Sequence, residues 1–260
     1  MMVTSYLQLN TQQKQAIVVA FQSGTECRAI PKILGVSGRS VARVLSEFGV
    51  NTKRRNRYTL NENYFDEIDT PTKSYLLGLM AADGCVTDKN YIVLESIDRE
   101  LVDLFAKEIE FSGEIREIDR SPHNPHFRIN FSSQRLAKAL HKWQIITNRM
   151  ASDSYRFPLG EQLNPYILGY FDGDGCAYPN KGRSGGLVCV VGSRNFAEEL
   201  SKLMGMGSTI AHSHKVVYYW RIFSRTNIQK FHDLMYQYPN LGLARKKEKI
   251  EQILGSYHRG

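Results

Sequence analysis

One stretch of this chain reads Tyr75-Leu-Leu-Gly-Leu-Met-Ala-Ala-Asp83-Gly84-Cys85, and a second reads Tyr166-Ile-Leu-Gly-Tyr-Phe-Asp-Gly-Asp174-Gly175-Cys176. Each is an apolar run, typical of a buried helix, that ends in Asp-Gly. A single Asp-Gly after such a run usually marks only a turn. The two copies, however, share a tyrosine, a glycine and Gly-Cys at the same offsets from the aspartate. Chance does not explain that agreement, so an internal repeat of about 90 residues organises this part of the chain.

Small residues are spaced four apart in both copies: Gly78 and Ala82 in the first, Gly169 and Gly173 in the second. This spacing places each pair on one helical face, where the absence of a large side chain lets two backbones approach closely. We therefore expect the two apolar runs to pack on each other as a pair of helices, with these four residues at their interface.

The residues after each run predict a metal site. Gly84 and Gly175 favour the left-handed conformation that commonly ends a helix, which would place Asp83 and Asp174 in the last turn. A carboxylate is disfavoured there by up to about 1 kcal/mol because the helix dipole is negative at that end, and two neighbouring carboxylates repel each other. A bound cation would relieve both effects. Oxygen donors without a nearby His or Cys ligand pattern suit Mg²⁺.

Leu76 to Gly84 and Ile167 to Gly175 resemble the signature of the LAGLIDADG homing endonucleases. The resemblance extends over about residues 72–254. It implies a site-specific DNA endonuclease that makes double-strand breaks in a long, non-palindromic target, with Mg²⁺ as cofactor and Mn²⁺ as its substitute. It also implies an α+β fold with a pseudo-twofold duplicated αββαββα order and saddle-shaped antiparallel sheets.

The segments around the motifs agree with that order. Hydrophobic periodicity predicts a strand or a helix in each of the following ranges: 91–97, 99–111, 114–119, 126–132 and 134–143, then 187–191, 196–204, 209–214, 216–223 and 227–238. With one short strand directly after each motif, the order αββαββα occurs twice.

The resemblance also assigns roles to single residues. Asp83 and Asp174 match the catalytic acids, which bind metal at the scissile phosphates. The backbone carbonyl groups of Ala82 and Gly173 are further ligand candidates. Asp172 occupies a position that varies in the family, and we interpret it as a packing residue.

A basic residue near each aspartate would offset the charge that grows on the phosphate. Arg245-Lys246 resembles an Arg-Lys pair found late in family repeats, so Lys246 is the candidate for the second repeat. An ordinary surface lysine in a charged run is an equally good interpretation of Lys246. In the first repeat the corresponding stretch contains Arg149 followed by Met150, which leaves Arg149 as the substitute and puts equal efficiency of the two sites in question.

Residues 11–49 read as three short helices separated by glycines. A short turn followed by a helix with Arg39, Ser40 and Arg43 on its open face is typical of a helix-turn-helix, whose last helix enters the major groove. Pro31 is compatible only with the first turn of the middle helix. A three-helix cap that makes no contact with DNA is the alternative.

A basic run, Lys53-Arg54-Arg55-Asn56-Arg57, follows these helices. We interpret it as a segment that binds phosphates, with a solvated linker as the alternative. The predicted organisation is a helix-turn-helix domain over 1–52, a basic linker and connector over 53–71, and LAGLIDADG repeats over 72–158 and 159–260.

Composition narrows the partner and the location. A net charge of +8 and a sequence pI near 9.3 favour a polyanion, here double-stranded DNA. The sequence lacks the apolar run of about 18 residues that a spanning helix needs, and it does not begin like a signal peptide. We therefore expect a cytoplasmic protein without a membrane partner. The four cysteines show no CxxC spacing, which argues against a zinc site.

Two motifs in one chain predict a monomer, since no second copy is needed to complete the site. Two other functions remain compatible with the sequence: an RNA-splicing maturase, which would bind RNA, and a transcription regulator that has kept the fold and lost cleavage. The presence of both Asp83 and Asp174 favours the endonuclease.

Overall fold

The protein is described by a computed structural model, which covers residues 5–50, 58–148 and 152–257. The chain divides into two compact units, residues 1–57 and 58–260. Each unit has a hydrophobic core of its own. Within the described ranges, no helix is both long enough and apolar enough to cross a membrane.

The N-terminal unit contains the three predicted helices, preceded by a short 3-10 turn. Its elements are η1 (Tyr6–Gln8), α1 (Thr11–Gln22), α2 (Ile30–Leu34) and α3 (Gly38–Glu47). Pro31 lies in the first turn of α2, as its missing N–H requires. Gly35, with φ of 63°, ends α2, and the Ser37 hydroxyl accepts a hydrogen bond from the backbone N–H of Ser40 to begin α3.

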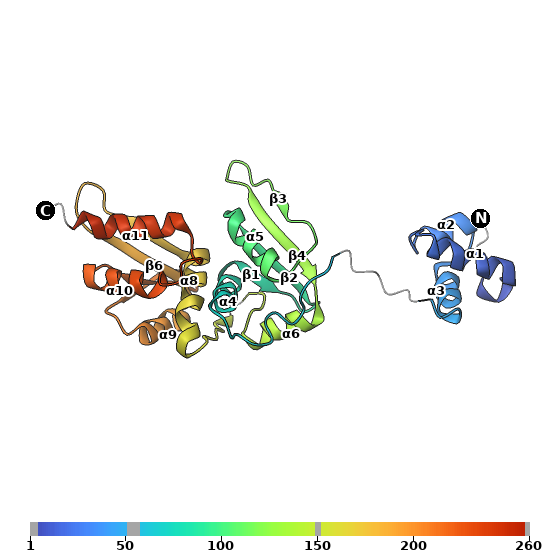
Figure 1. Ribbon diagram of the computed structural model, residues 1–260, viewed down its shortest axis with the longest axis horizontal. Coiled ribbons are helices and arrows are strands. Elements are labelled where there is room, and N and C mark those ends of the chain that lie inside the picture. The colour runs from blue at the N-terminus through green and yellow to red at the C-terminus, as the bar shows by residue number, and fades with distance from the viewer. Residues whose placement is uncertain (1–4, 51–57, 149–151, 258–260) are drawn as a thin grey trace. The chain divides into compact units, whose positions relative to one another are not determined.

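The C-terminal unit repeats one order of elements, as predicted (Figure 1). The first copy consists of α4 (Pro71–Asp83), β1 (Gly84–Val86), β2 (Tyr91–Ser96), α5 (Arg99–Glu108), β3 (Arg116–Ile118), β4 (His126–Ser132) and α6 (Gln134–Lys142). After η2 (Gly160–Gln162), the second consists of α8 (Leu163–Asp174), β5 (Gly175–Pro179), β6 (Gly186–Gly192), α9 (Arg194–Met204), β7 (Thr209–His214), β8 (Val217–Ile222) and α10 (Arg225–Met235). Helix α11 (Ala244–Ser256) completes the unit. The duplicated α+β fold is thereby confirmed.

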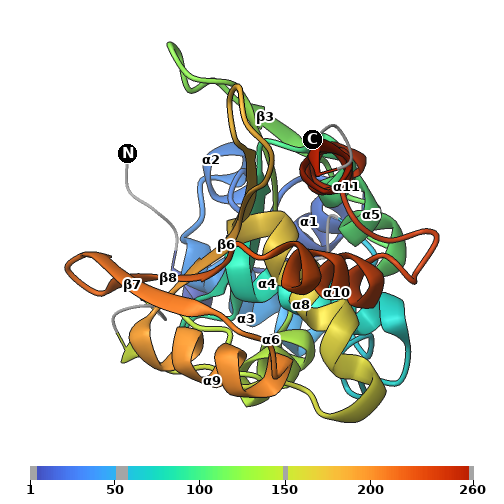
Figure 2. The same ribbon diagram turned by 90° about the vertical axis from the view of Figure 1, so that its left-hand side faces the viewer.

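Each copy forms one antiparallel four-stranded sheet, with strand order β1-β2-β4-β3 in the first (sheet 1) and β5-β6-β8-β7 in the second (sheet 2). Helices α5 and α6 pack against sheet 1, and α9 and α11 pack against sheet 2. Figure 2 shows α9 beside β7 and β8. Side chains alternate along β2, where Ile92 and Leu94 are fully buried and Tyr91 is exposed. One face of sheet 1 therefore meets the helices, and the other carries exposed and half-buried side chains. Burial alternates in the same way along β8, where Trp220 and Ile222 are fully buried and Tyr219 and Arg221 are half-buried.

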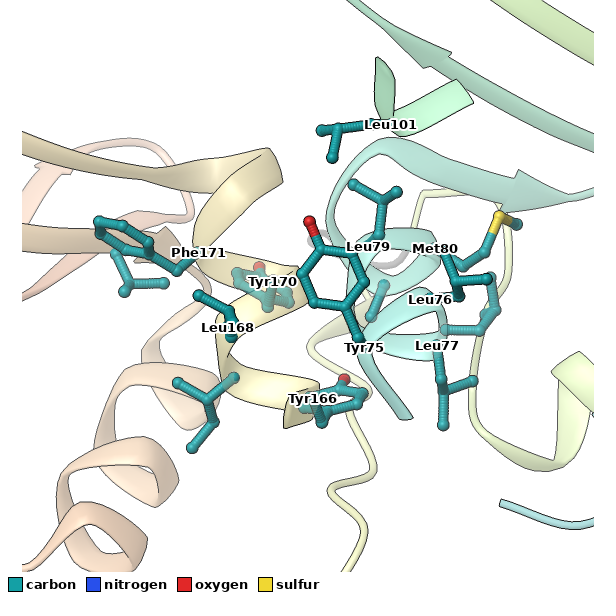
Figure 3. Packing of buried hydrophobic residues seen from close by; sticks show 14 of the residues in the cluster. Tyr75, Leu76, Leu77, Leu79, Met80, Leu101, Tyr166, Leu168, Tyr170 and Phe171 are labelled. Carbon is teal, nitrogen blue, oxygen red and sulfur yellow. The ribbon is translucent and has the colours of Figure 1, made fainter. Parts of the chain in front are cut away.

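The two motif helices, α4 and α8, pack side by side between the sheets (Figure 1). A Cβ atom on Gly78 would lie 1.9 Å from the Tyr166 carbonyl oxygen, and one on Gly169 would lie 1.9 Å from the Tyr75 carbonyl oxygen. The same close approach thus occurs twice, related by the repeat. Tyr75 of α4 lies beside Leu168 of α8 in the core that surrounds this contact (Figure 3). The predicted interface of small residues is confirmed.

The predicted left-handed ends of the motif helices are wrong. Gly84 and Gly175 have extended conformations, with φ of −98° and −107°, because each begins the strand that follows its helix. Glycine is needed there for space. A Cβ atom on Gly84 would lie 2.5 Å from Met80 Cε, and one on Gly175 would lie 2.1 Å from Phe171 Cδ2. Each motif thus passes from helix to strand without a loop, directly after its aspartate.

Candidate active site

Asp83 and Asp174 are the last residues of α4 and α8, at the same end of the helix pair. Gly173 brings the helices together there: a Cβ atom on it would lie only 3.3 Å from Asp83 Oδ1. Burial, followed by the charge of Asp174, raises the pKa of Asp83 to about 7. The structure therefore places the two carboxylates close enough for the mutual repulsion that the sequence predicts.

Two further groups lie close enough to Asp83 to favour its ionised form. The positive charge of Lys246 and a hydrogen bond from the Ser96 hydroxyl both act to lower the pKa of Asp83, although burial outweighs them. Ser96 is buried at the end of β2. Sequence analysis did not identify Ser96, since a serine within a predicted strand carries no signal of its own.

Lys246 is a buried cation whose side chain has an exposed fraction of only 4%. Its Nζ donates hydrogen bonds to the carbonyl groups of Phe171 (2.7 Å), Asp172 (2.6 Å) and Gly175 (2.7 Å). The Gly173 carbonyl is farther away, at 3.5 Å. Because the Phe171 and Asp172 carbonyl groups belong to the C-terminal end of α8, the ammonium group lies at the negative end of the dipole of that helix. Interpreting Lys246 as an ordinary surface lysine is therefore wrong.

Asp172 connects three helices around this site. Its Oδ2 accepts hydrogen bonds from the Tyr75 hydroxyl of α4 (2.7 Å) and from the backbone N–H of Leu243 (2.9 Å), at the start of α11. Burial raises the pKa of Asp172 to about 6. The arrangement agrees with the interpretation of Asp172 as a packing residue. It also holds the first turn of α11, which carries Lys246, against the motif helices.

We expect Lys246→Met to lower the free energy of unfolding by about 1–3 kcal/mol, because buried carbonyl groups would lose their hydrogen-bond donor. The matched control is Lys247→Met, one residue further along α11. The Lys247 side chain is half exposed and pairs with Glu251 at 3.8 Å, so this change should cost at most about 0.5 kcal/mol. Chemical denaturation measures both values. Equal losses for the two variants would show that the carbonyl contacts of Lys246 contribute little.

Of the predicted DNA-binding and basic residues that remain, two are exposed, one is buried and five lie outside the described ranges. Arg39 and Arg43 are exposed on α3, and the Arg43 guanidinium lies 4.2 Å from the centre of the Tyr6 ring. The prediction that Ser40 lies on the open face of this helix is wrong. Its exposed fraction is 1%, and its hydroxyl lies 2.7 Å from the Ser37 hydroxyl, because it belongs to the turn that begins α3. Five predicted residues lie outside the described ranges: Lys53, Arg54, Arg55, Arg57 and Arg149.

The donor set at the helix ends suits a hard divalent cation. Within the part of the chain that the structure describes, no group of three or more His, Cys, Asp or Glu side chains gathers as a metal cluster. The available donors are the carboxylates of Asp83 and Asp174 together with backbone carbonyl groups. Among the carbonyl oxygens near Lys246 Nζ, that of Gly173 is the most distant, at 3.5 Å, and is therefore the one most available to a cation. A few oxygen donors that leave room for water and phosphate fit Mg²⁺.

Comparisons with known proteins agree with the fold described above. Residues 161–236 match the LAGLIDADG-like domain family. No curated protein matches the chain. Similar solved structures include the LAGLIDADG homing endonuclease I-LtrWI bound to target DNA, which is 12% identical, with 76% of this chain and 92% of that chain covered at a TM-score of 0.52. The LAGLIDADG meganuclease I-AabMI bound to uncleaved DNA is 13% identical, with 73% and 92% covered at a TM-score of 0.53.

A third similar structure is the LAGLIDADG homing endonuclease I-GzeII in complex with its DNA target, which is 12% identical, with 73% of this chain and 91% of that chain covered at a TM-score of 0.53. Because the sequence identities are this low, the three similar structures show a shared fold and nothing more. Residues 161–236 thus match the LAGLIDADG-like domain family, and the unit of residues 58–260 has the two-motif, single-chain fold of the LAGLIDADG homing endonucleases.

Proposed function

We propose that this protein is a monomeric, site-specific DNA endonuclease that makes double-strand breaks in a long, non-palindromic target by Mg²⁺-dependent hydrolysis. One observation carries the proposal: Asp83 and Asp174 meet at the shared end of α4 and α8, between two sheets that each leave one face uncovered by helices. A twofold-related pair of acids suits two strands of opposite direction. Because the repeats differ in sequence, the two halves of the target need not match.

The chemistry assigns a task to each residue. Asp83 and Asp174 would hold the divalent cation with the carbonyl groups of Ala82 and Gly173, and Mn²⁺ would substitute for Mg²⁺. When bound, Mg²⁺ would act as a Lewis acid toward the phosphate and would lower the pKa of a coordinated water, which is the chemistry that phosphodiester hydrolysis requires. Ser96 orients the Asp83 carboxylate. Lys246 adds a positive charge, which would offset charge that develops on the phosphate.

The charge and the fold both support duplex DNA as the partner. A net charge of +8 attracts a polyanion, and the similar structures named above were determined with DNA bound. The uncovered faces of sheets 1 and 2 are the surfaces we propose to contact the duplex. Arg39 and Arg43, on α3, would add contacts through a helix-turn-helix, with Lys53, Arg54, Arg55 and Arg57 along the phosphates.

Cleavage of a supercoiled plasmid library in Mg²⁺ tests the proposal, with an intron-splicing assay run beside it. We expect linear plasmid from a subset of sequences, none of it in EDTA, and no effect on splicing. Stimulated splicing without plasmid cleavage would instead indicate a maturase. Selective binding of particular plasmids without a break in either strand would indicate a transcription regulator.

We expect pH to affect the stability of the metal-free protein through Asp83. Its pKa is about 7 in the folded chain against an ordinary value of 3.8. Between these values the folded state keeps a proton that the unfolded chain has lost, so the contribution of Asp83 to stability decreases as the pH rises from about 4 to about 7. Thermal unfolding of the wild type should therefore lose more stability between pH 5 and pH 8 than that of Asp83→Asn, whose amide does not titrate.

Mg²⁺ should reverse this loss, because the cation binds the ionised carboxylate and competes with the proton. We expect Mg²⁺ to raise the unfolding temperature of the wild type at pH 8, much less at pH 5, and little at either pH for Asp83→Asn. An identical effect of Mg²⁺ on both proteins would show that the ion does not bind at Asp83.

Deletion of residues 1–57 should weaken DNA binding by about 10-fold or more and flatten its salt dependence, because phosphate contacts would be lost. The truncated protein keeps its own core and should still cleave at high concentration. Its footprint should shorten at one end only, since the N-terminal unit is joined to the first repeat. Unchanged affinity, salt slope and footprint would return this unit to the alternative of a helical cap.

A further inference from the structure

One acidic side chain gathers three basic ones on the uncovered face of sheet 1. Glu95 Oε1 accepts a hydrogen bond from Arg120 Nη2 at 2.7 Å, and His126 Nδ1 lies 2.9 Å from the same oxygen. Glu95 Oε2 accepts a hydrogen bond from Arg128 Nε at 2.6 Å. We call these four residues the Glu95 cluster. The residues next to Glu95 in β2 are buried, so its side chain lies on the opposite face from the helices.

The Glu95 cluster is ionic, and its carboxylate is less exposed to solvent than its two guanidinium groups. Burial by itself would raise the pKa of Glu95, but the hydrogen bonds from Arg120 and Arg128 outweigh it, and the pKa is lowered. Glu95 is therefore a carboxylate at neutral pH beside two guanidinium groups, which leaves a net positive charge. The exposed fraction of the side chain is 16% for Glu95, 36% for Arg128 and 44% for Arg120. The arginines reach the solvent and the carboxylate holds them from below.

The guanidinium group of Arg128 has N–H donors that Glu95 does not use and that can bind another acceptor. Its Nε and Nη2 both contact Glu95 Oε2, which fixes the plane of the guanidinium group. Arginine has five N–H donors, so several remain for another acceptor. A guanidinium that is already held loses less conformational entropy when it binds. The commonest acceptors for such a group in the major groove are O6 and N7 of guanine, which it meets as a bidentate pair.

The cluster lies toward the active-site end of sheet 1. The residue that follows Glu95 is Ser96, whose hydroxyl contacts Asp83. A base that meets Arg128 would therefore be closer to the cleaved bonds than one that meets Tyr91, at the other end of β2.

The register of the two sheets identifies the equivalent place in the second repeat. In sheet 1, Gly84 pairs with Leu94, and the residue after Leu94 is Glu95. In sheet 2, Gly175 pairs with Val190, and the residue after Val190 is Val191. Across the adjoining strand, Glu95 faces Arg128, and Val191 faces Tyr219. The position that is ionic in the first repeat is thus aliphatic and aromatic in the second.

We propose that Arg128, held by Glu95, reads a guanine in the half-site bound by the first repeat, whereas Val191 and Tyr219 contact a thymine methyl group at the equivalent place in the other half-site. The inference rests on the proposed function, because it requires the uncovered sheet faces to meet the major groove. It adds a chemical identity to the target: a G·C pair on one side of the cleavage centre and an A·T pair at the matching distance on the other. Both contacts follow the donor, acceptor and methyl pattern of the major groove.

The test is selection of bound sequences from a random DNA pool by the full chain, followed by affinity measurements on the best sequence. We expect the wild type to prefer guanine at one position and Arg128→Ala to lose that preference there alone. Its affinity for the best sequence should fall by about 10-fold to 100-fold, with a much smaller change for random DNA. The matched control is Lys202→Ala, which removes one charge from a side chain that is 73% exposed on α9 and should leave every base preference unchanged.

Glu95→Gln tests whether Glu95 positions the Arg128 side chain or only stabilises the fold. The change removes a negative charge from the DNA-facing side, so binding of random DNA should strengthen, while discrimination for guanine should fall about 10-fold because Arg128 is held less firmly. A variant that was merely unstable would lose both. In the second half-site, replacing the contacted thymine by uracil removes one methyl group and should weaken binding about 4-fold.

Each outcome bears on the proposal. Survival of the guanine preference in Arg128→Ala, or an equal loss of affinity for all sequences, would overturn it and leave the proposed function in place. Insensitivity of binding to every thymine-to-uracil change would overturn the part that concerns Val191 and Tyr219. A wild-type protein that binds no DNA selectively would overturn the inference together with the proposed function.

Discussion

Asp83→Asn and Asp174→Asn are each expected to lose double-strand cleavage by about 1000-fold or more while still binding DNA. In the proposed mechanism, each change removes one anionic ligand of the cation without removing a phosphate contact. In that mechanism the cation would stabilise the transition state by several kcal/mol, and every 1.36 kcal/mol is tenfold in rate. Binding should even tighten, because a negative charge leaves the DNA-facing end of the helix pair. Gel-shift and cleavage assays on one selected target measure both quantities.

Asp103→Asn is the matched control. Asp103 is half exposed on α5, where it pairs with Arg99 at 3.3 Å one helical turn away, so its loss should leave cleavage unchanged. Full double-strand cutting by either Asp83→Asn or Asp174→Asn would refute the assignment of these acids. If each acid serves one strand, single-strand nicks that persist in one variant should fall on the strand that the other acid serves.

Gly78→Ala and Gly169→Ala are expected to have the largest effect on stability. The added Cβ atom would lie 1.9 Å from a backbone carbonyl oxygen of the other motif helix, and the next nearest atoms, at 2.8 to 3.0 Å, are also backbone. Backbone cannot rotate away as a side chain does, so α4 and α8 must separate, and the core around them loses its packing. We expect each variant to lose about 3 kcal/mol or more, which lowers the unfolding temperature by about 6–12 °C in a unit of this size.

Gly255→Ala provides the control for the same chemical change. Gly255 lies within α11, and a Cβ atom there would meet no atom within 4 Å. Alanine has the higher helix propensity, so this variant should be neutral or more stable by up to about 1 kcal/mol. Calorimetry of the three variants beside the wild type measures these differences. Stability losses below about 1 kcal/mol for both Gly78→Ala and Gly169→Ala would mean that the motif helices do not approach as closely as the structure shows.

The two halves of the candidate active site are not equivalent in the structure. In the second repeat, Asp172 accepts hydrogen bonds from Tyr75 and from Leu243, at the start of the helix that carries Lys246. In the first repeat the position that corresponds to Asp172 holds Ala81, which has no side chain able to make such a contact. The asymmetry that the sequence indicates at Met150 therefore has a counterpart inside the motif helix. It is consistent with a target whose halves differ.

The sequence by itself determined the duplicated fold and the meeting of the two motif helices. Periodic apolar residues specify which face of each helix or strand is buried, wherever that face finally packs. The spacing of Gly78 and Gly169 is equally local information, since backbones can approach only where side chains are small. Because Asp83 and Asp174 follow those faces directly, the approach of the helices also brings the carboxylates together.

Only the tertiary structure decided which polar groups complete the site. Lys246 Nζ binds the Phe171 carbonyl, 75 positions earlier in the chain, and nothing in the local pattern around Lys246 distinguishes it from its charged neighbours. The resemblance to the family named Lys246, but its burial and its carbonyl partners were not predicted, and Ser96, the burial of Ser40 and the extended conformation of Gly84 were missed. The reason is the same in each case. A single hydrogen bond or a single backbone angle depends on atoms from distant segments that packing brings within a few ångströms, whereas periodicity reports only which side of an element faces the core.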